Sequence, residues 1–384
     1  MTVSSLRRGP APHHPAQAST HAKAPAHAQA ASSGGSHELK RVKTDATLKP
    51  TGFTASDKAI SQAVATGTLK PVGGLDHLPL DRHYHATHPT TGMKHQRPAG
   101  FTWNHEDGTT PNWFPQAVTT SSDANAQGKI HGRDWVAVTW HSKDNKHSRV
   151  SFVDYTHPND GQKAKYRNVD LVMPDPKHPG KFSPVACHAG GASMVGHYLY
   201  VADTHGGLRV FDMNKLAQVK DHSAVPKGTS SVVLPQVGFY RVPPELKGKP
   251  GAPVFSGLSV DRKHNALVSQ EYRKDKTGGK IIRWPLDLET GKLKTDASGS
   301  VRATEAFSVP LARVAGVVAR GDGFDIATMG SPGHLYHATP GHAVKAQDTL
   351  AKGIQQFSWD AQRKQTWTLD EHPHHRAVWH FKPE

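Results

Sequence analysis

The chain has 384 residues, a formal net charge of +15, 28 histidines and one cysteine, Cys187, which excludes an intrachain disulfide. No run of about 20 apolar residues is present, so the sequence predicts no transmembrane segment. The excess of Lys and Arg attracts polyanions such as nucleic acid, teichoic or uronic polymers and acidic membranes, or it serves solubility alone. Because histidines gain charge at mildly acidic pH, we expect any polyanion binding to strengthen there.

The N-terminal third of the chain has few strand signals. Residues 1–45 are rich in Ala, His, Pro and Ser and lack apolar periodicity, which predicts a disordered basic tail. Arg7-Arg8 fits the basic end of a signal peptide and residues 26–30 fit its cleavage site, but no hydrophobic segment lies between them. A truncated signal peptide and a simple tail therefore both remain open. Residues 46–110 form an N-terminal segment, with one helix predicted at 55–66.

From residue 111 onward, three kinds of predicted strand recur five times in the same order. The first kind is rich in small residues and lies at 116–119, 188–192, 256–260, 315–318 and 355–359. The second is a fuller apolar strand at 135–140, 198–202, 266–271, 324–329 and 366–371. The third ends each unit, at 150–154, 208–212, 281–285, 334–338 and 377–381.

This repetition predicts an all-β fold, a β-propeller of five blades over residues 111–384. The small residues suit innermost strands that crowd around an axis. The last unit ends at Phe381 without room for a fourth strand, so we expect an N-terminal strand near 47–53 or 68–73 to close the ring. A β-sandwich is the rival, but it would not require the same three-strand unit five times.

Four stretches within roughly 111–381 resemble a known group of proteins. They are Trp113-Phe114-Pro115-Gln116 with Ser122-Asp123-Ala124; His188-Ala189-Gly190-Gly191 with Leu208-Arg209-Val210-Phe211-Asp212; Glu271-Tyr272 with Arg283-Trp284-Pro285-Leu286-Asp287; and Trp367-Thr368-Leu369-Asp370-Glu371-His372-Pro373. On these stretches the chain resembles exported actinobacterial β-propeller proteins of unsettled activity. The resemblance implies a propeller fold and an extracellular location. That group would have Gly at Ala117 and His374 and an acidic pair at Gln355-Gln356, so an acidic role at that blade is in doubt.

Polar residues recur at the starts of the first strands and at the turns between second and third strands. In an up-and-down propeller these places lie on one face, where they surround a funnel, the usual form of a ligand site. The residues that we expect to bind a ligand there are Trp113, Gln116, His205, Ser256, Tyr272, Gln355 and His372.

Two glutamates, Glu271 and Glu371, each follow an apolar strand. A pair of carboxyl groups is the common catalytic machinery of glycoside hydrolases, and partial desolvation would raise the pKa values of both groups. Asp203 is a third candidate carboxylate, and His188 is a candidate general base or metal ligand. The alternative is that these side chains hydrogen-bond backbone groups at blade corners.

One loop has the spacing of a calcium site. The six residues 123–128 and Asp134 place oxygen ligands at positions 1, 3, 5 and 12 and Gly at position 6. The ligands would be Asp123, Asn125, Gln127 and Asp134, and the calcium would be structural. Gln is a weak ligand and Asp at position 12 is shorter than Glu, so an Asx-type hairpin loop is the alternative.

These residues lead to three hypotheses from different classes. The first is an exported monomer that binds a carbohydrate or cell-wall polymer, an extracellular polysaccharide, at its funnel. The second is a glycoside hydrolase or lyase that uses the paired carboxylates. The third is a scaffold for protein–protein interaction. Zinc-finger, RNP-like and phosphate-loop motifs are absent from the sequence, so no specific nucleic-acid partner is expected.

Overall fold

The computed structural model describes residues 37–94, 96–175, 178 and 180–384. All described residues belong to one compact unit, Ser36–Glu384. The predictions that concern residues 1–36, which include Arg7-Arg8 and the cleavage-like stretch 26–30, lie outside the described residues.

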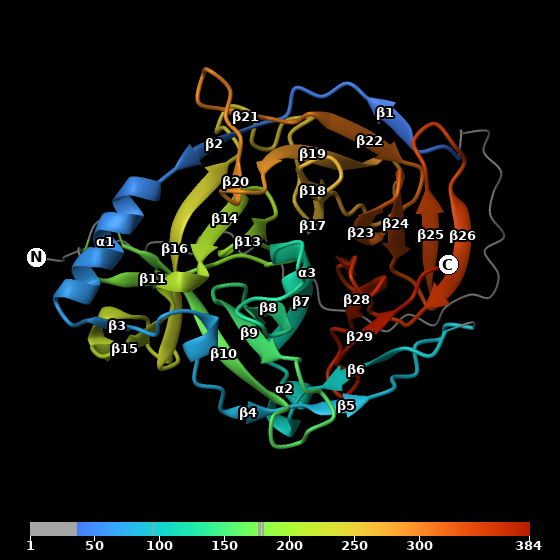
Figure 1. Ribbon diagram of the computed structural model, residues 1–384. Helices are drawn as coiled ribbons and strands as arrows, with labels where there is room; N and C mark the ends of the chain where they lie inside the picture. The colour runs from blue at the N-terminus through green and yellow to red at the C-terminus, as the bar shows by residue number, and fades with distance from the viewer. Residues whose placement is uncertain (1–36, 95, 176–177, 179) are drawn as a thin grey trace, which may run out of the picture. The chain divides into compact units, whose positions relative to one another are not determined.

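The repeated unit of the described chain is a four-stranded antiparallel meander (Figure 1). The first meander consists of β7 (Trp113–Thr120), β8 (Trp135–Ser142), β9 (Ser148–Asp154) and β10 (Lys165–Pro174), and the second of β12 (Ala192–Val195), β13 (Tyr198–Asp203), β14 (Gly207–Asp212) and β16 (Val232–Arg241). The third consists of β17 (Gly257–Asp261), β18 (Ala266–Gln270), β19 (Gly279–Asp287) and β22 (Glu305–Val309), and the fourth of β23 (Val314–Arg320), β24 (Gly323–Thr328), β25 (Gly333–Ala338) and β26 (Lys345–Leu350). The last consists of β27 (Ser358–Asp360), β28 (Gln365–Leu369), β29 (Ala377–Phe381) and β6 (Ala99–Thr102). The first three strands of each meander fall at or close to the positions that the sequence repeat predicts.

The first strands of the meanders contact one another in a closed ring. β7 contacts β12, β12 contacts β17, β17 contacts β23, β23 contacts β27, and β27 returns to β7. A Cβ at Gly191 would lie 2.7 Å from the carbonyl carbon of Gly257, and one at Gly316 would lie 2.7 Å from the amide nitrogen of Phe357. Small residues are therefore required where neighbouring sheets meet at the axis. Sheets that radiate from such a ring make the described unit a β-propeller.

The fourth strand of the last meander comes from the N-terminal segment. β6 pairs with β29, with Phe101 opposite Val378 and Gly100 opposite Trp379. The expected position of this strand, near 47–53 or 68–73, was wrong. Both of those stretches contain a proline, which lacks an N–H and suits strands at outer edges. Phe101 of β6 is fully buried against Trp103 and Tyr84.

Short strands cover the outer edges of these sheets, which otherwise invite pairing with other chains. β1 (Lys40–Val42) pairs with β22, β2 (Thr47–Thr51) with β16 and β21 (Val301–Arg302), and β3 (Leu69–Pro71) with β15 (Ala217–Val219). The remaining short elements are β4 (Arg82–His83), β5 (His85–Thr87), β11 (Phe182–Pro184), β20 (Lys292–Leu293) and the 3-10 turns Leu75–His77, Met213–Lys215 and His222–Ala224. Residues 40–42, which we expected in the tail, thus belong to a sheet because they pair with its outermost strand.

Helices are few in the described chain: α1 (Phe53–Ala65), α2 (His105–Thr109) and α3 (Ser121–Ala124). α1 confirms the helix predicted at 55–66. It packs on β16, where the rings of Phe53 and Tyr240 meet edge to face at 5.3 Å. Figure 1 shows α3 near the centre of the ring. No described helix is long and apolar enough to cross a membrane.

A buried carboxylate holds the closing segment in place. Asp107, in α2, is 1% exposed and accepts hydrogen bonds from Arg149 Nη2 at 2.7 Å, Tyr166 Oη at 2.6 Å and Asn168 Nδ2 at 2.9 Å. Arg82 Nη1 lies 3.1 Å from the same carboxylate. Burial alone would raise the pKa of Asp107, but Arg149 and Tyr166 outweigh burial and lower it.

Arg376 joins the two ends of the ring. Its guanidinium donates to the carbonyl oxygens of Asp107 and Thr110, both at 2.9 Å, and of Trp113, at 2.6 Å. Its Nε donates to the carbonyl oxygen of Glu371 at 2.9 Å. One side chain of the last meander therefore ties the closing segment to the first strand of the first meander.

Gln356 connects three of the innermost strands at the axis. Its Oε1 accepts from the amides of Ala192 at 2.8 Å and Leu258 at 3.2 Å. Its Nε2 donates to the carbonyl oxygens of Val118 at 2.9 Å and Ala192 at 2.6 Å. An amide both donates and accepts, whereas an ionised carboxylate only accepts, so the glutamine is required here.

Gln356→Glu is expected to lower the free energy of unfolding by about 3 kcal/mol, because it removes a buried donor and adds a buried charge. Gln62→Glu makes the same chemical change on an exposed side chain of α1 and should shift stability by less than about 0.5 kcal/mol. Urea denaturation at pH 7.5 compares the two variants. Equal stabilities would show that the amide at the axis does not hold the strands together.

Candidate functional site

The described chain has a cavity of about 460 Å³ on one face of the ring, called the funnel cavity below. Its lining residues are Gln116, His188, Gly190, Thr204, His205, Val254, Ser256, Tyr272, Val314, Ala315, Met329, Gln355 and Glu371. Seven of these were expected at the funnel from the sequence: Gln116, His188, His205, Ser256, Tyr272, Gln355 and Glu371.

The strand order explains this convergence. Gln116 lies in β7 and Ser256 directly precedes β17, whereas Tyr272 and Glu371 follow second strands. Successive strands of a meander run in opposite directions, so first-strand starts and second-strand ends reach the same face. The topology therefore places residues that are far apart in the sequence around one cavity.

Gln116 and Glu371 link the first and last meanders inside the cavity. Gln116 Nε2 donates to Glu371 Oε2 at 2.8 Å. Gln116 is buried, with 2% of its surface exposed. The same nitrogen also donates to the Pro115 carbonyl oxygen at 3.1 Å, so two hydrogen bonds fix the Gln116 amide. The Glu371 carboxylate is thus held in one orientation at the cavity wall.

His188 and His141 form a packed pair of imidazoles. Their ring centroids are 4.4 Å apart, and His141 stacks on Phe114 at 5.5 Å. His141 Nδ1 lies 2.8 Å from the Ser142 carbonyl oxygen, so this nitrogen carries the proton and donates. Desolvation and, second, His141 lower the pKa of His188 to about 4. Desolvation also lowers the pKa of His141. Both rings are therefore neutral at pH 7.

Tyr272 supplies an aromatic surface at the cavity. It is 36% exposed, and among the described residues no other large hydrophobic side chain is exposed. Its backbone N–H donates to Ser256 Oγ at 3.1 Å, which fixes the turn that presents the ring. Val254, Val314 and Met329 add apolar wall to the cavity.

A second cavity of about 280 Å³, called the side cavity, adjoins the funnel cavity. Its lining residues are His205, Val242, Lys247, Gly248, Lys249, Pro250, Gly251, Ala252, Pro253, Val254, Glu271, Arg273 and Lys280. His205 and Val254 line both cavities.

Glu271 belongs to the side cavity, so the structure does not bring it together with Glu371. Glu271 Oε1 lies 3.1 Å from Arg273 Nε, and its Oε2 accepts from the Lys280 amide at 3.2 Å. Asp203 pairs with Arg209, at 2.7 Å, and lines neither cavity. Of the expected carboxylates, Glu371 alone lines the funnel cavity.

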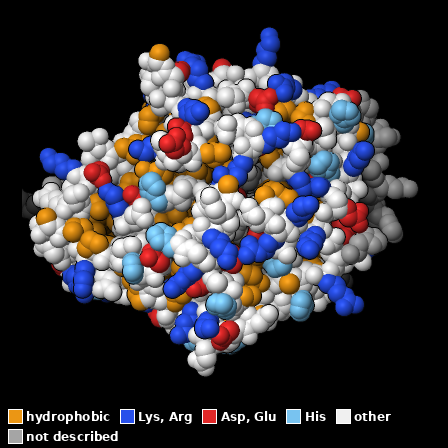
Figure 2. Space-filling view, viewed as in Figure 1, with side chains coloured by type: hydrophobic (Ala, Val, Ile, Leu, Met, Phe, Trp, Pro, Cys, Tyr) orange, Lys and Arg blue, Asp and Glu red, His pale blue; other side chains and the backbone are white. Residues whose placement is uncertain are grey.

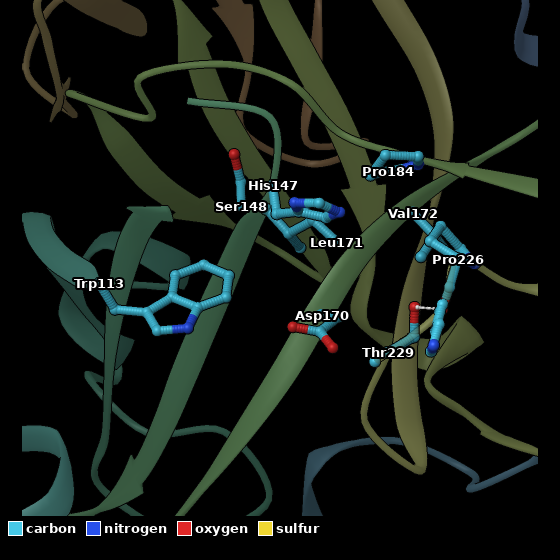
Figure 3. Close-up of a pocket in the computed structure, with 11 residues that line it drawn as sticks. Trp113, His147, Ser148, Asp170, Leu171, Val172, Pro184, Pro226 and Thr229 are labelled. Atoms are coloured by element: carbon cyan, nitrogen blue, oxygen red, sulfur yellow. Dashed lines mark hydrogen bonds between the residues drawn. The ribbon is translucent and has the colours of Figure 1, made fainter. Parts of the chain in front are cut away.

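Two expected ligand-binding residues lie elsewhere. Trp113 lines a cavity of about 140 Å³ beside β10, together with His147, Asp170 and the loop that carries Pro226 and Thr229 (Figure 3). Its ring is covered on one side by the Arg149 guanidinium, 4.5 Å from the ring centre. The His372 ring packs against Gly353, where a Cβ would lie 2.6 Å from it.

Three side chains of the expected calcium loop, those of Asp123, Asn125 and Asp134, bind protein groups in this structure. The Asp123 carboxylate accepts from Thr119 Oγ1 and Ser358 Oγ, both at 2.7 Å, and burial raises its pKa to about 6. Asp134 lies 2.9 Å from Arg363 Nη2. The Asn125 amide nitrogen donates to the Lys129 carbonyl oxygen at 2.7 Å. Across the described residues, no group of three or more His, Cys, Asp or Glu side chains is placed to hold a metal ion. A calcium site made partly by Asn125 and Gln127 stays a prediction.

The sequence reasoning missed the basic residues of the side cavity. Lys247 and Lys249 lie in a loop rich in Pro and Gly, and Arg273 and Lys280 flank the turn after β18. A Lys-x-Lys pair in such a loop was the available signal, but spacing alone does not connect it to the funnel. Figure 2 shows Lys and Arg side chains spread over the viewed face, with Asp, Glu and His among them.

Comparison with known proteins shows no family, and the similar solved structures match at low identity and low TM-score. No protein-family model matches the chain, and no curated protein matches it. The Myxococcus xanthus glutaminyl cyclase structure is 10% identical, with a TM-score of 0.35 over 79% of this chain and 99% of that one. A Xanthomonas campestris gluconolactonase is 11% identical, with a TM-score of 0.31 over 80% and 99%. The Cps50 (Swd1) beta-propeller domain of Myceliophteria thermophila is 10% identical, with a TM-score of 0.36 over 80% and 98%. At these identities and TM-scores the similarities carry no argument about ligand or activity.

The His188 ring is expected to titrate near pH 4 rather than near the ordinary 6.5. Because the unfolded chain binds this proton at a higher pH than the folded chain, the contribution of His188 to stability is complete above pH 6.5 and is lost as the pH falls towards 4. NMR of the imidazole Cε1–H signals, with His188→Asn to assign the resonance, measures the midpoint. A midpoint near 6.5 would mean that the contact with His141 does not desolvate the His188 ring.

Proposed function

We propose that this chain is a five-bladed propeller that works outside the cell as a monomer and binds a carbohydrate polymer in the funnel cavity. The blade number rests on the ring of contacts from β7 through β12, β17, β23 and β27 back to β7. Export rests on the sequence resemblance alone.

The observation that carries the proposal is the exposed ring of Tyr272 beside side-chain amides and a hydroxyl group. A sugar ring presents an apolar face and a rim of hydroxyl groups. Tyr272 offers a flat surface for that face, while Gln355 and Ser256 offer groups that both donate and accept hydrogen bonds. A concave, largely preformed cavity with a few polar groups is the usual form of such a site.

The position of the carboxylates favours binding over hydrolysis. Glycoside hydrolysis commonly needs two carboxyl groups that flank the scissile bond. Glu371 lines the funnel cavity and is tied to Gln116, whereas Glu271 faces the side cavity beside Arg273. Activity as a hydrolase or lyase, and a role as a protein scaffold, are therefore the alternatives that the experiment below distinguishes from binding.

Tyr272→Ala is expected to weaken polysaccharide binding about fivefold, because stacking on an aromatic ring contributes about 1 kcal/mol. Affinity electrophoresis of the full-length protein through gels that contain single neutral or acidic polysaccharides measures the change. Tyr272→Trp retains the flat surface and should bind within about threefold of the native chain.

Mass spectrometry of the polysaccharide after incubation separates the alternatives. Retardation without new oligosaccharides supports the proposal. New oligosaccharides would instead make the protein an enzyme. No retardation on any polymer would overturn carbohydrate binding and leave the scaffold hypothesis.

A further inference from the structure

We propose that the side cavity binds an anionic group of the carbohydrate chain that the funnel cavity holds, which makes the ligand an acidic polysaccharide. This inference rests on the proposed function, since it adds a second subsite to the same ligand. It assigns a role to Lys247, Lys249 and Lys280, which no other part of the site uses.

The two cavities form one continuous surface. His205 and Val254 line both of them, and the neighbouring residues Glu271 and Tyr272 line the side cavity and the funnel cavity respectively. A chain of sugar rings that stacks on Tyr272 therefore has space to continue past His205. The volume of about 280 Å³ suits one further sugar ring with its substituent.

The charge of the side cavity selects for anions. Four of its lining residues, Lys247, Lys249, Arg273 and Lys280, are cationic, and one, Glu271, is acidic. Arg273 pairs with Glu271 at 3.1 Å, which neutralises both. Within the described chain, the other three side chains form no ion pair with a carboxylate. An unpaired cluster of like charges in a concave site raises the local concentration of an oppositely charged ligand.

The loop that carries Lys247 and Lys249 is anchored to the funnel. The Val242 amide donates to the Gly206 carbonyl oxygen and the Phe255 amide to the Thr204 carbonyl oxygen, both at 2.9 Å. The loop therefore leaves and returns at the turn that contains His205. Such a compact loop with close ends is frequently functional. Both lysines are exposed, so their charged ends are available to a ligand.

An acidic polysaccharide fits these observations better than a nucleic acid does. Binding of single-stranded nucleic acid uses a long basic groove with several aromatic side chains for successive bases. Here one exposed aromatic residue, Tyr272, lies beside one basic cavity, and His205 and Val254 form the wall that the two cavities share. The anionic group itself is a carboxylate or a phosphate, because the ammonium group of lysine binds both.

The test compares acidic chains with their uncharged counterparts. Polyuronates are presented beside the same polymers after carboxyl reduction, and poly(glycerol phosphate) serves as the phosphate arm. We expect at least one acidic chain to bind the full-length protein about tenfold more tightly than its uncharged counterpart. Preference for a polyuronate identifies a carboxylate, and preference for poly(glycerol phosphate) identifies a phosphate. Single-stranded DNA is the control polyanion and is expected to bind more weakly than the preferred chain.

A double variant assigns the preference to the side cavity. Lys247→Ala with Lys249→Ala should weaken binding of the acidic chain about fivefold and leave the carboxyl-reduced chain unchanged. Lys58→Ala with Lys220→Ala removes two exposed charges elsewhere and should change neither.

The inference and the proposed function fail in distinguishable ways. Equal binding of acidic and uncharged chains, or a charge preference that survives in the double variant, overturns the side cavity as an anion site and leaves the funnel as a carbohydrate site. Tighter binding of DNA than of every polysaccharide overturns the ligand class. No binding to any chain overturns both proposals.

Discussion

The buried carboxylate of Asp107 is the interaction on which the closed ring depends most. It lies in the short helix after the closing strand and is surrounded by Arg149, Tyr166 and Asn168 of the first meander. The Arg376 guanidinium of the last meander reaches the backbone of the same helix. An unpaired carboxylate in this place would be strongly destabilising, so its full set of partners fixes where the N-terminal segment docks. Because that segment supplies the last outer strand, the Asp107 cluster holds the two ends of the propeller together.

Closure of the ring determines the packing at its axis and the funnel cavity on its face. At the axis, glycines allow neighbouring sheets to approach, and Gln356 hydrogen-bonds to three innermost strands at once. At the face, the same ring brings Gln116 of the first meander within 2.8 Å of Glu371 of the last. The funnel cavity is therefore a product of closure, and the amide of Gln116 in its wall is positioned by strand β7. The side cavity differs, since a loop anchored at both ends supplies two of its four cations.

The repeat of small-residue, apolar and closing strands was sufficient to predict the all-β fold, the strand positions and most of the funnel. The closing strand was missed because Ala99–Thr102 is short and contains glycine, while Thr47–Thr51 and Leu69–Pro71 serve as edge strands. Glu271 and Glu371 occupy equivalent places in the repeat, but Arg273 holds the first away from the funnel and Gln116 holds the second towards it. Such side-chain directions depend on partners distant in the sequence, and spacing does not reveal them. The acidic pair expected at Gln355-Gln356 is replaced by amides, one of which donates to two carbonyl oxygens on the axis.

A crystal structure of the full-length protein with the oligosaccharide that it binds most tightly locates the ligand and so tests whether the funnel cavity is the carbohydrate site. We expect a sugar ring stacked on Tyr272, hydroxyl groups within hydrogen-bond distance of Gln355 and Ser256, and an acidic group directed towards Lys247 and Lys249. A ligand bound elsewhere, for example in the cavity beside Trp113, would contradict the assignment of the funnel as the carbohydrate site.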